Sequence, residues 1–358
     1  MVALRELLRE AGEHGASDLH LSVGVQPKMR VDGKLKNMQY GKLTASDTLE
    51  ILVDVMSVEQ RERFEVRGEM DMSFSVPNLG RYRLSAYRQR GTVALAIRIM
   101  GNDLSVAEHL GIPKAFLELH HKRRGLILVT GPAGSGLSTT VAALIDRINS
   151  MEESLIITLE DPIEYMHHHK KSMVNQREIG LDTKDYATAL QSVLREDPDV
   201  IYIGTILDAE TIRIALSAAE AGCLVISSMH VIGAYQTLLQ LIHTFPTQEQ
   251  EQVRLQLANI LTAVVSQQLV PVTEGQGRTP AFEVMIADGR IREAIREDRL
   301  SQLPALMMES KETGMCLMDD SLIELCREGK ISNGYAVRFA TDKDRVLSSL
   351  GDAEISHI

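Results

Sequence analysis

The chain of 358 residues contains no tryptophan, few aromatic residues (4%) and only three cysteines. Cys223, Cys316 and Cys326 form neither a CxxC pair nor the spacing of a zinc site, so the sequence predicts free thiols and no structural metal. No apolar stretch is long enough and free enough of charge to cross a bilayer, and the N-terminal segment has the spacing of a surface helix, not of a signal peptide. These absences predict a cytoplasmic protein without a transmembrane segment.

The charge balance is acidic, with 49 Asp and Glu residues against 38 Lys and Arg residues and a net charge of -11. Non-specific nucleic-acid binding requires a basic face, so we expect no nucleic-acid partner. The fractions of hydrophobic (44%) and charged (24%) residues are those of an ordinary globular protein. The length is sufficient for two domains with separate cores.

The first hundred residues predict a small α+β domain with the boundaries 1–100. Alternation of polar and apolar residues predicts short strands, and residues 44–66 have helical periodicity. A linker and a helix are expected over 101–124. The predicted strands of this domain cover 18–22, 28–32, 71–76, 81–88 and 92–100.

From Gly125 the pattern changes to alternating strands and helices, which is typical of a parallel sheet covered by helices on both faces. The predicted α/β core covers 125–287, and a C-terminal helical region follows over 288–358. The predicted strands are 126–130, 154–159, 200–204, 223–228 and 282–287, and the predicted helices are 137–149, 184–196, 208–221, 234–243 and 248–268.

A glycine-rich segment, GPAGSGLSTT over 131–140, lies between the first predicted strand of the core and the helix after it. Strand, glycine turn and helix form the context of a phosphate-binding loop, in which backbone N–H groups surround phosphate oxygens and a hydroxyl holds Mg²⁺. The sequence therefore predicts a site for ATP or ADP, with Ser138 as a ligand of Mg²⁺. The expected nucleotide-binding residues are Gly131, Gly134, Ser135, Gly136, Leu137, Ser138 and Thr139.

Leu137 occupies the position at which the loop pattern requires a lysine. That lysine normally reaches the terminal phosphates, and its charge-assisted contacts are worth about 1.5–3 kcal/mol each. The backbone amides and the helix N-terminus still attract phosphate without it. We therefore expect nucleotide to bind, but weakly.

Three carboxylates follow the predicted strand 154–159, at the end of a strand where open α/β sheets bind their ligands. Glu160 and Glu164 are candidate catalytic residues, because carboxylates at this place can orient Mg²⁺-bound water or an attacking water. In the alternative interpretation, Asp161 and Glu164 cap a following helix. The residues alone favour neither interpretation.

Two further candidates adjoin later strands. Asp199 precedes an apolar strand and Gly204 in the manner of a Walker B segment, so we predict that it faces the nucleotide and its Mg²⁺. Thr205 follows where a hydrolytic site needs a carboxylate, and a hydroxyl is far too weak a base for that role. His230 ends another strand, where it either donates a hydrogen bond to a γ-phosphate or has a structural role.

These segments, in this order, resemble those of the type IV pilus retraction ATPases, the twitching-motility branch of the secretion ATPase superfamily. The resemblance covers nearly the whole chain. Besides the loop, it rests on LEDPIEY (159–165), VNQREIG (174–180), LREDPD (194–199) and RIREAIRE (290–297).

The resemblance implies a PAS-like N-terminal domain, a RecA-like core and a hexameric ring with ATP bound between the two domains. It also implies an inner-membrane pilus assembly platform protein as a partner, and a location at the inner face of the cell membrane. In such rings the N-terminal domain offers arginines to the nucleotide, and Arg83, Arg90 and Arg98 occupy the matching strands. In the alternative interpretation, these arginines are solvated strand edges.

The sequence departs from this family at positions that perform catalysis. Leu137 replaces the lysine of the loop, Thr205 replaces the Walker B glutamate, and Cys223 replaces a histidine. Several coordinated losses indicate relaxed selection on catalysis with the fold retained. We therefore interpret the chain as a homologue with impaired ATP hydrolysis. It would act as an accessory or regulatory subunit of a ring, either a homo-hexamer or a hexamer mixed with an active paralogue.

Two alternatives stay open on the sequence alone. The chain is an active motor if Lys170, Lys171 or an arginine of a neighbouring subunit replaces the missing charge. It is a structural adaptor if it binds no nucleotide. Nucleotide binding distinguishes the adaptor from the other two, and turnover distinguishes the motor.

Overall fold

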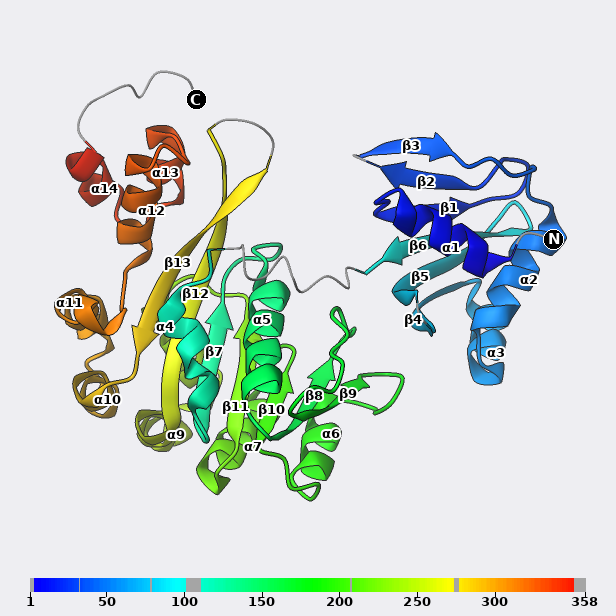
Figure 1. Cartoon of the computed structure of the whole chain (residues 1–358). Coiled ribbons are helices and arrows are strands. Elements are labelled where there is room, and N and C mark those ends of the chain that lie inside the picture. The colour runs from blue at the N-terminus through cyan, green and yellow to red at the C-terminus, as the bar shows by residue number, and fades with distance from the viewer. Residues whose placement is uncertain are drawn as a thin grey trace. The chain divides into compact units, whose positions relative to one another are not determined.

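The structure, a computed structural model of the chain, describes residues 3–31, 33–77, 79–100, 111–206, 208–273 and 277–350. The chain divides into two compact units, one formed by Met1–Asp103 with Glu164–Met166 and the other by Leu104–Ile163 with His167–Ile358. Figure 1 shows the elements of each unit. The predicted domain boundaries stay predictions, and parts of the linker (101–110) and of the C-terminal region (351–358) lie outside the described residues.

The first unit contains a six-stranded antiparallel sheet in the order β3-β2-β1-β6-β5-β4. Its helices bury apolar side chains such as Leu8 and Leu52 in one cluster with Leu19 and Leu21 of β1. The elements are α1 (Leu4–Glu13), β1 (Asp18–Leu21), β2 (Lys28–Val31), β3 (Lys34–Asn37), α2 (Ala45–Val55), α3 (Val58–Arg67), β4 (Glu69–Val76), β5 (Gly80–Gln89) and β6 (Thr92–Ile99).

The helical segment predicted over 44–66 is two helices, because the chain is interrupted at Ser57. The Ser57 side chain accepts a hydrogen bond from the Gln60 N–H, and the Gln60 side chain accepts one from the Ser57 N–H. This capping box starts α3 shortly after α2 ends. The apolar periodicity continues through the break, so periodicity alone does not reveal it.

The second unit is built on a seven-stranded sheet in the order β13-β12-β7-β11-β10-β8-β9. Neighbouring strands are parallel except β12 and β13. One apolar cluster contains Leu126 and Leu128 with residues of α6 to α9, and another contains Ile127 and Val129 with residues of α4 and α5. Because successive residues of a strand face opposite sides, helices cover both faces of the sheet. The predicted fold class, an α/β core after a small α+β unit and before C-terminal helices, is confirmed.

The strands of the second unit are β7 (Gly125–Thr130), β8 (Leu155–Glu160), β9 (Met173–Glu178), β10 (Val200–Ile203), β11 (Leu224–Met229), β12 (Leu261–Pro271) and β13 (Arg278–Ile286). Its helices are α4 (Lys114–Leu117), α5 (Leu137–Met151), α6 (Tyr186–Val193), α7 (Ala209–Ala221), α8 (Ala234–His243), α9 (Thr247–Ile260), α10 (Gly289–Arg296), α11 (Leu303–Glu309), α12 (Met318–Arg327), α13 (Asn333–Phe339) and α14 (Lys343–Leu350).

The helix predicted over 248–268 is wrong in its second half. Helix α9 ends at Ile260, and the next residue begins β12, which lies between β13 and β7. Almost every residue of β12 is buried, so the strand lacks the alternation by which a half-buried strand is identified. No glycine or proline separates the helix from the strand. The strand places Gln267 beside the glycine loop 131–136.

A buried carboxylate joins β13 to two helices. Glu283 is 8% exposed; its Oε1 accepts a hydrogen bond from the Ala234 N–H at 2.6 Å, and its Oε2 accepts one from the Met318 N–H at 3.3 Å. Both donors are first residues of helices, α8 and α12, where a negative charge is favourable. Burial raises the pKa of Glu283, and the two amide hydrogen bonds act against that shift. Glu283 therefore connects the core sheet with the C-terminal helices.

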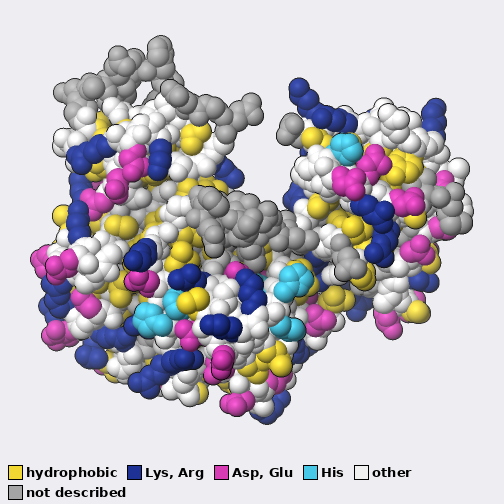
Figure 2. Space-filling model, in the orientation of Figure 1, with side chains coloured by type: hydrophobic (Ala, Val, Ile, Leu, Met, Phe, Trp, Pro, Cys, Tyr) yellow, Lys and Arg dark blue, Asp and Glu magenta, His cyan; other side chains and the backbone are white. Residues whose placement is uncertain are grey.

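Charged side chains of both signs are interspersed over the described surface on the face that Figure 2 shows. No helix of the described residues is both long and apolar enough to span a membrane.

Candidate functional site

The glycine loop connects β7, which ends at Thr130, with α5, which begins at Leu137. Gly134 (φ 76°) and Gly136 (φ 87°) have left-handed backbone conformations, which residues with a Cβ rarely adopt. The turn leaves the first amides of the 15-residue helix α5 without partners inside the helix. This is the geometry of an anion site, so the predicted phosphate loop is present as a local structure.

Gly131 is required for another reason, the closeness of β12. A Cβ at Gly131 would lie 2.2 Å from the Gln267 carbonyl oxygen and 2.7 Å from the Ser135 Oγ. The loop is therefore packed directly against β12. The sequence pattern places this residue in the phosphate loop but does not reveal the strand that it contacts.

The side chain at the lysine position belongs to the hydrophobic core. Leu137 is 7% exposed and lies in the apolar cluster that contains Val129 and Val141. Ser138 and Thr139 follow in the first turn of α5 and are half-buried. The loop thus retains the hydroxyl that can hold Mg²⁺, while the residue expected to contact terminal phosphates carries no charge.

Two buried side chains at the loop, those of Ser135 and Gln267, carry hydrogen-bond donors. The Ser135 Oγ is buried and has no hydrogen-bond partner among the described residues. The Gln267 side chain is 4% exposed, accepts a hydrogen bond from the Thr140 hydroxyl on its Oε1, and places its Nε2 3.0 Å from the point where a Gly136 Cβ would be. Both groups fit a phosphate ligand in the loop, which supports the predicted site for ATP or ADP.

The predicted catalytic residue His230 lies beside the loop. It directly follows β11, whose last residue Met229 pairs with Thr130, and the Gly131 N–H donates to the Met229 carbonyl at 3.2 Å. His230 is exposed. Its place agrees with contact to a ligand in the loop, which stays a prediction.

Glu160 and Thr205 are neighbours at the carboxyl ends of β8 and β10. The Glu160 Oε1 accepts hydrogen bonds from the Thr158 hydroxyl (2.6 Å) and the Gln176 amide (3.1 Å), and a Cβ at Gly204 would lie 3.4 Å from the Glu160 Cα. Glu160 is therefore a buried carboxylate next to the position where Thr205 replaces the expected acid. The structure brings these two positions together.

Tyr186 lies near Glu160 and Thr205, and no sequence motif identifies it. Burial raises the pKa of its hydroxyl, and the nearby Asp161 and Glu160 carboxylates raise it further. The Thr205 N–H lies within hydrogen-bond reach of that hydroxyl and lowers the pKa. The sequence offers no signal for Tyr186, because it lies on α6, 26 residues after Glu160.

Glu164 is exposed and belongs to the segment 164–166, which is grouped with the first unit. The alternative that Asp161 and Glu164 cap a helix is wrong, because residues 161–185 form no helix. The catalytic role of Glu164 stays a prediction.

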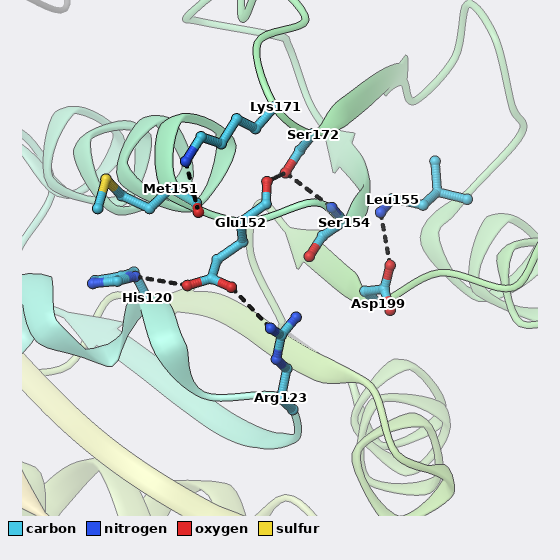
Figure 3. Close-up of polar contacts among 9 residues, drawn as sticks. All are labelled: His120, Arg123, Met151, Glu152, Ser154, Leu155, Lys171, Ser172 and Asp199. Atoms are coloured by element: carbon cyan, nitrogen blue, oxygen red, sulfur yellow. Dashed lines mark hydrogen bonds and ion pairs between the residues drawn. The ribbon is translucent and has the colours of Figure 1, made fainter.

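The prediction that Asp199 faces the nucleotide is wrong. Asp199 precedes β10, and its Oδ2 accepts a hydrogen bond from the Leu155 N–H at 2.8 Å, where β8 also begins. Figure 3 shows this contact near Glu152, whose carboxylate pairs with Arg123. The Asp199 carbonyl accepts a hydrogen bond from the first residue of β11, and that residue pairs with Gly125, six residues before the loop. At a rise of ~3.3 Å per residue, Asp199 therefore lies about 20 Å from the phosphate site. An acid that precedes a parallel strand lies at the edge opposite to the ligands.

Lys170 and Lys171 are also far from the loop. The Lys170 Nζ pairs with Asp146 at 2.7 Å, and the Lys171 Nζ contacts the Met151 carbonyl oxygen at 3.5 Å (Figure 3). Asp146 and Met151 follow Leu137 on α5 by nine and 14 residues, which corresponds to about 14–21 Å along the helix. Neither lysine replaces the missing charge in this structure.

The three candidate arginines lie in the first unit. Arg83 on β5 is the register partner of Arg98 on β6, and the Arg98 Nε donates to the Asp18 carboxylate at 3.1 Å. Arg90 lies in the turn between these strands with a φ of 49°. The structure thus brings two of the arginines together and leaves the third at the far end of the hairpin. Their contact with a nucleotide of a neighbouring subunit stays a prediction.

The three consecutive histidines have different surroundings. His167 is buried and its Nδ1 has no hydrogen-bond partner among the described residues, whereas the His169 Nδ1 accepts a hydrogen bond from the Val174 N–H at 3.0 Å. Burial lowers the pKa of His167 from 6.5 to about 4; the charges of Lys170 and His168 also lower it, and Asp146 opposes them. His167 is therefore neutral in the folded protein at neutral pH.

We expect His167 to make the fold sensitive to acid. The unfolded chain binds a proton near pH 6.5 and the folded chain only near pH 4, so stability is complete above pH 6.5 and is lost as the pH falls from 6.5 towards 4. The contribution lost is about 3 kcal/mol at 1.4 kcal/mol per pKa unit. Urea unfolding at pH 7 and pH 4.5 measures it. His167→Gln should lose less stability over this interval than the wild type, and the exposed His168→Gln should behave like the wild type. Equal losses for His167→Gln and the wild type would contradict this prediction.

Fold and site together define a P-loop protein with a RecA-like core. Residues 2–303 match the family described as Type II/IV secretion system protein, and the chain belongs to this family. It is 41% identical over 333 residues to the type IV pilus retractation ATPase PilT of Pseudomonas aeruginosa, with 93% of this chain and 96% of that protein covered. It is 36% identical over 356 residues to the type IV pilus ATPase PilU of the same organism, with 99% and 93% covered.

Two solved structures resemble the fold. One is a crystal structure of the pilus retraction motor PilT with bound ADP, at 43% sequence identity and a TM-score of 0.89, with 96% of this chain and 99% of that chain covered. The other is the Legionella pneumophila ATPase DotB, at 23% identity and a TM-score of 0.79, with 92% of each chain covered. The second likeness extends to the fold alone.

Proposed function

We propose that this protein is a type IV pilus retraction-ATPase homologue that binds ATP or ADP weakly, hydrolyses ATP poorly and serves as an accessory or regulatory subunit of a ring. The observation that carries the proposal is Leu137, which lies in the hydrophobic core where the loop pattern has a phosphate-binding lysine. Relatives named as pilus retraction ATPases over nearly the whole chain support the pilus assignment.

The residues that remain support binding. The loop glycines, the free amides at the start of α5 and the unpartnered Ser135 Oγ suit a phosphate group. Ser138 would hold Mg²⁺ with the phosphates, as the hydroxyl of a phosphate loop does. A structure of PilT, a relative of similar length, is described with bound ADP.

The residues that are missing weaken turnover. A hydrolytic site stabilises the charge of the transferred phosphoryl group, and a single cationic group can contribute about 10³–10⁵ in rate. A positioned base contributes roughly 10²–10⁴ more. The chain has Leu137 and Thr205 at the positions of these two groups.

An active motor is the second candidate function. It is favoured by Glu160, a buried carboxylate beside Gly204 and so next to the position of the missing acid. In either case the ring would lie on the cytoplasmic side of the inner membrane and contact a pilus assembly platform protein there.

Assembly tests the proposed role. We expect the purified chain to form hexamers, alone or mixed with an active retraction ATPase, because packing of subunits does not require hydrolysis. Multi-angle light scattering, with and without nucleotide, measures the mass. Ser138→Ala, which removes the proposed Mg²⁺ ligand, should form the same particles. A monomer at high concentration that also fails to assemble with an active homologue would reject the ring-forming role.

A further inference from the structure

We propose that Arg278, on the hairpin formed by β12 and β13, supplies the positive charge for nucleotide phosphates that the glycine loop itself lacks. This inference rests on the proposed nucleotide binding and names the residue that reads the phosphates.

Arg278 contacts the glycine loop but belongs neither to the loop nor to α5. It is the first residue of β13, and its Nη1 donates a hydrogen bond to the Gly134 carbonyl oxygen at 3.2 Å. Its register partner is Pro271, the last residue of β12. The same hairpin carries Gln267 against the loop, so both contacts follow from the place of β12 next to β7.

The Arg278 charge is not neutralised by an ion pair within the described residues, unlike that of Lys170, which is paired with Asp146. The side chain is exposed. A guanidinium group has five N–H donors, and the Gly134 carbonyl uses one of them. Arg278 therefore combines an unpaired charge, unused donors and a position at the phosphate loop.

Independent evidence for an anion at this place comes from the buried donors. The Ser135 Oγ is unpartnered inside the loop, and the Gln267 Nε2 lies 3.0 Å from the position of a Gly136 Cβ. Both side chains are more than nine-tenths buried. A buried polar group without a partner, as the Ser135 Oγ is, is rare in folded proteins, and a bound phosphate would satisfy it.

Arginine suits the task chemically. Its planar fork binds phosphate oxygens in a bidentate way, whereas lysine acts as a point charge. Because the arginine comes from a strand hairpin and not from the loop helix, Leu137 is free to join the hydrophobic core. The class of ligand is a nucleoside di- or triphosphate with Mg²⁺.

Calorimetry with MgADP and MgATP on the full chain tests the proposal. Arg278→Gln retains an N–H donor for Gly134 but removes the charge, and we expect it to weaken binding by roughly 10- to 100-fold and to reduce the salt dependence of the affinity. Arg278→Lys should lose less affinity for nucleotide than Arg278→Gln. Adding Leu137→Lys to Arg278→Gln should restore binding. The control is Arg213→Gln on α7, which removes an exposed ion pair with Glu249 of α9 and should bind like the wild type.

Two results would overturn the inference. One is an Arg278→Gln variant that binds nucleotide with the affinity of the wild type. The other is equal weakening in Arg278→Gln and Arg278→Lys together with a lower melting temperature, because a mere loop contact would behave in this way. If the wild type binds no nucleotide, the proposed function itself fails, and the adaptor alternative is supported instead.

Discussion

Purified wild-type protein is expected to hydrolyse ATP at the background rate. The two groups that most directly assist phosphoryl transfer, the loop lysine and the base that accepts the proton of water, are replaced by Leu137 and Thr205. Their combined loss corresponds to a rate reduction of roughly 10⁵ or more, which lies near the limit of a steady-state assay.

Restoring the two positions separates binding from chemistry. Leu137→Lys alone should improve nucleotide affinity more than rate, although the new side chain must extend from a buried site to bring its ammonium group to the loop. Leu137→Lys with Thr205→Glu should be needed for measurable turnover. Phosphate release under steady-state conditions measures this. A wild-type rate of about one per second or faster, abolished by Ser138→Ala, would establish the active-motor alternative.

Gly131→Ala is expected to damage both the fold and the nucleotide site. The added Cβ would lie 2.2 Å from the Gln267 carbonyl oxygen, so either the loop or β12 must move. Both are packed backbone segments, and we expect a loss of about 3 kcal/mol in the free energy of unfolding. Nucleotide binding should fall below detection, because the amides of the loop move with Gly131.

The controls are Gly134→Ala and Gly180→Ala, in which a positive φ opposes the new side chain but no atom clashes with it. Both glycines have a left-handed φ, 76° and 81°, and a Cβ added to either would meet no atom within 4 Å. Each should cost about 1–2 kcal/mol from the conformation alone. Urea unfolding and calorimetry compare the three variants. A Gly131→Ala protein as stable as Gly134→Ala would show that β12 does not constrain the loop.

The phosphate loop could be predicted from the sequence because its signals are local. The glycines have a fixed spacing, a buried strand lies directly before them and a helix directly after them. All three signals lie within residues 125–151. The sheet strands β7, β8, β10 and β11 were predictable for the same reason, since each is a short apolar run bounded by polar residues.

The partners of the loop could not be predicted, because they depend on the order of strands in the sheet. Strand β12 continues from α9 without a glycine or proline and lacks alternation, so its apolar residues extend the helical pattern. Gln267 and Arg278 therefore had no assigned place near the loop. The prediction for Asp199 was wrong for the opposite reason. Its local pattern is that of a functional acid, but the residue lies before its strand instead of after it.

The two amide contacts of Glu283 have a consequence for how the protein unfolds. If the C-terminal helices separated from the core, the Met318 N–H and the Glu283 Oε2 would each lose their hydrogen-bond partner. The same carboxylate holds the first turn of α8, four residues after His230. Loss of the C-terminal helices is thereby coupled to loosening of the segment next to the phosphate loop. The second unit should consequently melt in a single cooperative transition, not by stepwise fraying from its C-terminal end.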